Sequence, residues 1–193
     1  MLLLLLTAAV LLAPVPRLTP TATSAPTAPD PDPTPAPAPA VPAVGRAWPV
    51  GVRPLILRGW EPPATTYGRG HRGVDLAAPA GTPVRAVAAG RVSFAGRVAG
   101  KGVVSVELPG TGDPPLRTTY EPVRAAVKKG DEVEAGEVVG TVEATGSHCT
   151  ETCVHWGLRR AGTYLDPLSL LPPWLLRRGP SRLLPVLGVP LPS

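Results

Sequence analysis

The sequence predicts one all-β domain, folded as an antiparallel hybrid of a sandwich and a barrel. Short runs rich in β-branched residues recur between Trp48 and Leu171. No long apolar stripe with the period of a helix occurs in that region. Gly, Pro or Asp clusters separate the runs at intervals of about eight to twelve residues, which is typical of antiparallel sandwiches and barrels.

Six of these runs are predicted strands, because valine, threonine and aromatic side chains favour a pleated backbone. They are residues 83–87, 91–94, 103–108, 116–120, 138–142 and 153–158. An internal repeat adds to this prediction. Residues 80–84 and 90–92 resemble residues 129–133 and 136–140, each copy having a glycine turn, an expected buried valine and a glycine-led strand. Two such copies indicate a folded-over sheet.

The second copy alone is also similar to the lipoyl- and biotinyl-carrier fold. Carriers of that kind need a modified lysine at the tip of a hairpin. Lys128 and Lys129 precede the glycine turn instead, so a carrier function is not expected.

The two ends of the 193-residue chain are rich in Pro, Ala and Leu, and this composition separates them from the central domain. Residues 1–25 are interpreted as a signal peptide, because the apolar run 2–12 is shorter than the about 20 residues that span a bilayer. An uncleaved N-terminal anchor is the alternative. We expect a Pro/Ala-rich linker over residues 26–45, the domain over 46–171 and a Pro/Leu-rich tail over 172–193.

Charge and cysteine content narrow the class of protein. The net charge is +5, but the domain has no run of Lys or Arg and few aromatic residues that could stack on bases, so nucleic-acid binding is not expected. Cys149 and Cys153 are expected to form a disulfide in an exported protein. A reduced Cys153 acting as a thiolate metal ligand stays an alternative.

Three histidines carry the chemistry that the sequence suggests: His71, His148 and His155. His71 and Asp75 are four residues apart, and in an extended segment they point to one face, where both could bind zinc. His155 lies in a predicted strand two residues after Cys153 and shares its face. It is a natural third ligand, and three protein ligands are typical of catalytic zinc.

Several segments together resemble the lysostaphin/LytM family of zinc metallopeptidases. The most specific is 71–84, where H-x3-D is followed by A-P-x-G-T-P-V; the segments 129–140 and 154–167 fit the same pattern. The resemblance covers about residues 48–171 and implies the folded-over β architecture. It also implies one Zn²⁺ held by His71, Asp75 and His155, with hydrolysis of a peptide bond in the peptidoglycan cross-link.

Two positions depart from the family pattern. Cys153 and Glu121 stand where the family has its two accessory histidines. Glu121 is predicted to act as the general base, although a carboxylate is a poor stabiliser of an oxyanion. His148 is expected to be a solvated residue of the loop before the last predicted strand; the alternative is that it swings into the site. Arg159, at the end of that strand, is also expected to be solvated, with contact to anionic wall polymers as the alternative.

The sequence therefore predicts an exported, extracellular or cell-wall-associated monomer that acts on peptidoglycan peptides as a zinc metalloendopeptidase. The alternative is a catalytically impaired module that binds the wall or activates a cell-wall hydrolase. A domain without metal is the third hypothesis.

Overall fold

The computed structural model describes residues 40–65 and 67–177. The expected signal peptide or anchor (1–25), most of the expected linker and the tail from residue 178 lie outside these ranges. No helix among the described residues is long and apolar enough to cross a membrane.

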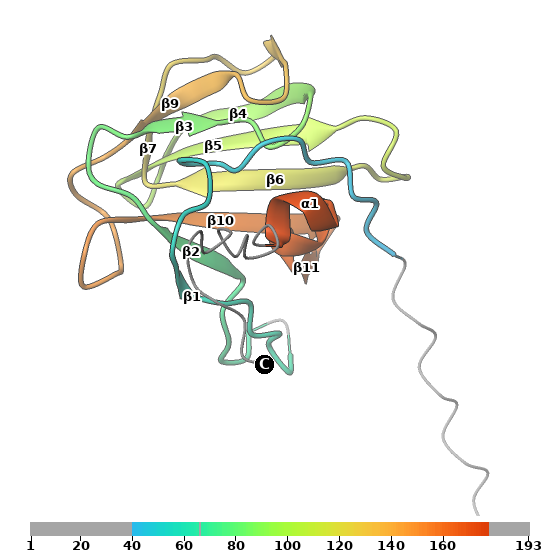
Figure 1. Ribbon diagram of the computed structural model, residues 1–193, viewed down its shortest axis with the longest axis horizontal. Helices are drawn as coiled ribbons and strands as arrows, with labels where there is room; N and C mark the ends of the chain where they lie inside the picture. Colours follow the sequence, from blue (N-terminus) through green and yellow to red (C-terminus); the bar gives the residue numbers. More distant parts are fainter. Residues whose placement is uncertain (1–39, 66, 178–193) are drawn as a thin grey trace, which may run out of the picture. The chain divides into compact units, whose positions relative to one another are not determined.

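The described chain forms two antiparallel sheets, which confirms the all-β fold class (Figure 1). The larger sheet has the strand order β1-β2-β10-β6-β5-β4-β8, with β11 paired to β10, and the smaller has the order β3-β9-β7. The strands are β1 Ile56–Arg58, β2 Gly73–Ala77, β3 Pro83–Arg85, β4 Gly90–Val98, β5 Lys101–Leu108, β6 Leu116–Glu121, β7 Val123–Ala125, β8 Glu132–Val133, β9 Val138–Val142, β10 Cys153–Arg160 and β11 Thr163–Leu165.

All six predicted strands are present as β3, β4, β5, β6, β9 and β10. The sequence did not predict the other five. Four of these, β1, β7, β8 and β11, have only two or three residues, too few for an alternating pattern. The fifth, β2, contains Gly73 and Asp75, two residue types that are depleted in strands.

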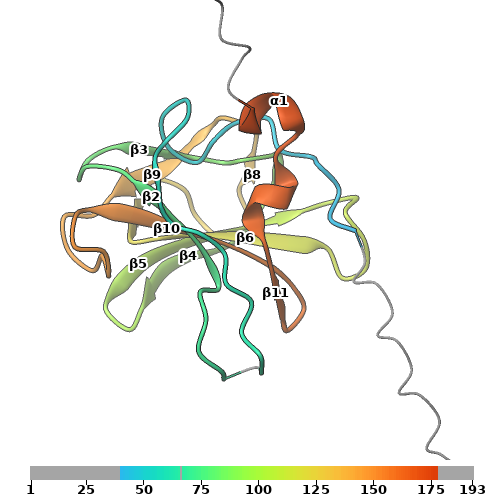
Figure 2. The same ribbon diagram turned by 60° about the horizontal axis from the view of Figure 1, so that its bottom comes forward.

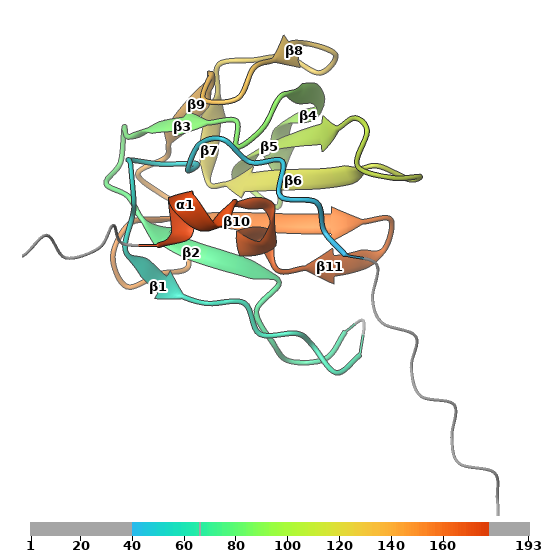
Figure 3. The same cartoon turned by 45° about the vertical axis from the view of Figure 1, so that its right-hand side comes forward.

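The internal repeat has a direct structural counterpart. The strands of the first copy are β3 and β4, and those of the second are β8 and β9. They pair reciprocally, β3 with β9 and β4 with β8 (Figure 3). Gly81 and Gly130, in the matching turns, have φ values of 83° and 100°, which residues with a Cβ rarely adopt. The two copies therefore fold over one another.

The core is filled mainly by valine, leucine and three large aromatic residues. Trp156 is fully buried, packs edge-on against Trp48, and donates its Nε1–H to Thr118 Oγ1 over 2.7 Å. The buried hydroxyl of Tyr120 accepts the Val87 amide over 3.0 Å, and burial raises the pKa of Tyr120 to about 12. These contacts hold β6 and β10 against the core.

The packed region extends past both expected boundaries of the domain. Val41 and Val44, in the last part of the expected linker, pack against the core. After β11 the chain forms a short 3-10 segment, η1 (Pro167–Leu170), and one helical turn, α1 (Pro173–Leu176) (Figure 2). Leu175 and Leu176 also contact the core. The start of the expected tail is thus packed.

Candidate metal centre

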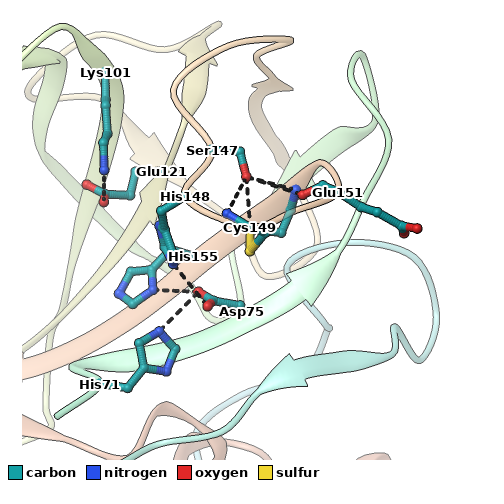
Figure 4. The surroundings of a disulfide bond; sticks show 10 residues. His71, Asp75, Lys101, Glu121, Ser147, His148, Cys149, Glu151 and His155 are labelled. Atoms are coloured by element: carbon teal, nitrogen blue, oxygen red, sulfur yellow. Dashed lines mark hydrogen bonds and ion pairs between the residues drawn. A yellow bond between two sulfur atoms is a disulfide. The ribbon is translucent and has the colours of Figure 1, made fainter.

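Strand register brings Asp75 and His155 together from distant parts of the sequence. Asp75 on β2 lies directly opposite His155 on β10. The His155 Nδ1 atom is 2.8 Å from Asp75 Oδ1 (Figure 4). Two of the predicted metal ligands therefore meet at one point of the large sheet.

His71 approaches the same carboxylate oxygen from just before β2. Its Nδ1–H donates to the Gly59 carbonyl over 2.6 Å, and in a neutral ring with this tautomer Nε2 carries the lone pair. That buried Nε2 has no hydrogen-bond partner within residues 40–65 and 67–177, and it lies 3.1 Å from Asp75 Oδ1. A nitrogen lone pair facing a carboxylate oxygen is unfavourable unless a cation lies between them. The residues present therefore fit a metal ion.

Gly73 permits this arrangement by lacking a side chain. A Cβ at this position would lie 2.6 Å from His155 Nε2 and 2.4 Å from the Trp156 carbonyl oxygen. Both distances are shorter than real Cβ contacts. The His155 ring thus lies over Gly73, and any larger residue would displace it.

Asp75 is only 2% exposed and remains ionised. Burial alone would raise the pKa of its carboxyl group, but hydrogen bonds from His155 and His148 outweigh this effect and lower the pKa to about 2. A buried carboxylate among imidazoles is a donor set that suits Zn²⁺.

His148 lies in the loop before β10 with its side chain 38% exposed, as expected, but it also contacts this cluster. Its Nε2 lies 3.0 Å from Asp75 Oδ2, whereas His71 and His155 both contact the other carboxylate oxygen, Oδ1. The ligand atoms of His71, Asp75, His148 and His155 all lie within 4.8 Å of one another.

The predicted disulfide is present and explains how a loop residue reaches the site. Cys149, next to His148, is bonded to Cys153, which precedes His155 by two residues on β10. The Ser147 hydroxyl accepts the amides of Cys149 and Cys153 over 3.2 and 3.4 Å (Figure 4). The loop is therefore fastened to the strand that carries His155. The signal for His148 in the sequence was its position beside a cysteine.

Glu121 lies next to His155 across the sheet. It is the residue of β6 directly opposite His155, so Asp75, His155 and Glu121 occupy one level of three adjacent strands. Its Oε1 is 3.5 Å from Lys101 Nζ on β5, a residue that the sequence analysis did not single out. Glu121 is 27% exposed at the side chain and lines a groove together with His155.

The chain is similar to several known proteins. The model of peptidase family M23 matches residues 69–167. The chain is 41% identical over 129 residues to the uncharacterized protein Rv2891 of Mycobacterium tuberculosis, covering 64% of this chain and 50% of Rv2891. It is 37% identical over 103 residues to the DD-carboxypeptidase/endopeptidase Mpg of Neisseria meningitidis, covering 53% of this chain and 23% of Mpg.

A solved structure is similar as well. The catalytic domain of the antimicrobial peptidase lysostaphin from Staphylococcus simulans has a TM-score of 0.51 and 26% identity, over 64% of this chain and 93% of that domain. The chain spans half or less of the length of the two curated relatives.

Proposed function

The chain belongs to peptidase family M23, and from that membership we propose that it is an exported zinc metalloendopeptidase that cleaves peptide bonds of peptidoglycan. The single observation that carries the proposal is the convergence of His71 Nε2 and His155 Nδ1 on one oxygen of the buried Asp75. These three residues would hold one Zn²⁺. The disulfide supports an extracytoplasmic location, because such bonds persist in oxidising compartments.

When bound, zinc would polarise the scissile carbonyl and lower the pKa of a water molecule. Side chains of the chain itself would accept the proton and position the base. We infer that Glu121 takes a proton from the attacking water; its position beside His155 and its exposure to the groove support this role. Lys101, 3.5 Å from Glu121, holds this carboxylate on the groove side of the sheet and adds a positive charge there.

A second candidate function is a module that binds peptidoglycan, or activates a cell-wall hydrolase, without cleaving the wall itself. It is favoured by Cys153, whose sulfur is engaged in the disulfide where the family pattern has an accessory histidine. Against it stands His148, which brings a third imidazole to the metal centre from another part of the chain.

Zinc content and peptide release from purified sacculi, measured on one preparation, separate the two candidates. The peptidase should contain one zinc per chain and release new amino termini from sacculi, and chelation should abolish the release. One zinc without new termini would favour the binding module. A chain that takes up no zinc would overturn the zinc peptidase and equally a binding module that keeps its zinc.

The disulfide is proposed to act on the metal centre through His148. Nε2–H of His148 donates to Asp75 Oδ2, and hydrogen bonds to a metal-binding carboxylate fix its orientation. The variant Cys149→Ser/Cys153→Ser should therefore bind zinc about 10–100-fold more weakly, as judged by competition with a chelator. His148→Ala should weaken binding equally.

Combining these variants tests whether the disulfide affects zinc affinity through His148. Cys149→Ser/Cys153→Ser/His148→Ala should bind zinc no more weakly than His148→Ala alone, because both changes remove the same hydrogen bond. Thr150→Ala, an exposed change inside the disulfide loop, should leave the affinity unchanged. Additive losses would contradict a disulfide that acts through His148.

A further inference from the structure

The groove beside the metal centre has a second, strongly basic end. It lies on the face of the large sheet that carries His155 and Glu121, and has a volume of about 450 Å³. Arg72, Arg117 and Arg159 also line it, whereas Glu121 is the one carboxylate among the described residues of its lining. Because Glu121 is already paired with Lys101, it does not balance Arg117 and Arg159.

Two of the arginines face each other. Arg117 on β6 lies directly opposite Arg159 on β10, so both side chains stand on the same face of the sheet. Like charges in this position destabilise a sheet. Glu107 on β5, the neighbouring strand away from β10, lies opposite Arg117. Among the described residues, however, no carboxylate lies within 4.0 Å of the guanidinium nitrogens of Arg117 or Arg159.

Tyr164 on β11 holds two of the arginines at the groove. The guanidinium carbons of Arg72 and Arg159 each lie 5.7 Å from the centre of its ring, within the range of cation–π contacts. Arg159 also donates from Nε to the Ala161 carbonyl over 2.7 Å. Arginines fixed in this way lose little freedom when they bind an anion.

The distance between the two ends of the groove suits a peptide. His155 and Arg159 are four residues apart on β10, which corresponds to about 13 Å in a strand. Gly157 and Thr119 lie between these ends and line the groove. A peptide extended along the groove would reach the arginines about three to four residues from its cleaved bond.

We propose that Arg117 and Arg159, with Arg72, form a subsite for a free carboxylate of the peptide substrate. A carboxylate between the opposed guanidinium groups would accept charge-assisted hydrogen bonds from both and relieve their repulsion. This proposal rests on the proposed function and deepens it, since it assigns acidic peptides as the substrate class.

Binding of matched peptides tests the subsite. The probes are soluble stem peptides from sacculi and the same peptides with their carboxylates converted to carboxamides. Calorimetry measures the affinity of the full chain for each peptide, first as purified and then after chelation. After chelation, neither peptide cleavage nor contact with a metal contributes to the measured heat. The carboxylate form should bind about tenfold more tightly, with a preference that decreases as the salt concentration rises.

Arginine variants test whether the preference for the carboxylate peptide arises in the groove. In Arg117→Gln/Arg159→Gln the two peptide forms should bind equally, whereas Arg53→Gln/Arg124→Gln, which removes two exposed charges elsewhere, should keep the preference. A preference that survives in Arg117→Gln/Arg159→Gln would overturn the subsite, and so would equal binding or no binding of both forms by the parent chain. Release of peptides from sacculi is measured separately, so a failed subsite is distinguishable from a failed peptidase.

Discussion

His71→Ala is expected to remove zinc from the protein and to abolish peptide release from sacculi. Among the described residues, His71 Nε2 is a buried nitrogen without a hydrogen-bond partner, and it lies 3.1 Å from Asp75 Oδ1, where we propose that zinc binds. Loss of an outer hydrogen bond at a metal centre costs about 10–100-fold in affinity, and loss of a ligand should cost more. Zinc content after dialysis and the dissociation constant from chelator competition measure the effect.

Two controls accompany this experiment. Glu134→Ala removes an exposed carboxylate on another part of the surface and should retain one zinc with full activity. Circular dichroism and thermal unfolding establish that the His71→Ala chain is folded. If the folded variant still binds zinc as tightly as the parent, His71 is not a ligand.

Glu121→Gln is expected to lower kcat for peptide release by about 10²–10⁴-fold, the usual contribution of a general base. Glutamine keeps the size of the side chain and an oxygen facing Lys101 Nζ, but it cannot accept a proton from water. The KM and the zinc content should change little, because Glu121 lies opposite His155 and outside the cluster that surrounds Asp75.

Glu132→Gln is the matched control for this variant. Glu132 is an exposed glutamate on β8 of the same sheet, and its loss should leave kcat unchanged. A Glu121→Gln enzyme with the kcat of the parent would eliminate Glu121 as the base. A lower zinc content in this variant would instead assign Glu121 to the metal centre.

Much of this molecule was predictable because its signals are local. The six predicted strands are present since each run is long enough to show its β-branched composition. The spacing of Cys153 and His155 within one strand places both on one face without reference to the rest of the fold. His71 lies before β2, and the chain bends at Arg72, so the spacing alone did not decide its approach to Asp75. The repeated glycine turns likewise predicted a folded-over sheet.

The tertiary structure decided what depends on partners far apart in the sequence. Strand register, which spacing along the chain does not encode, places Asp75, His155 and Glu121 at one level and sets Arg117 against Arg159. The contact of His148 with Asp75 depended on the closure of its loop. Local spacing thus determined which groups share one face of a strand, and non-local pairing determined which groups surround Asp75, because only pairing fixes distances between separate strands and loops.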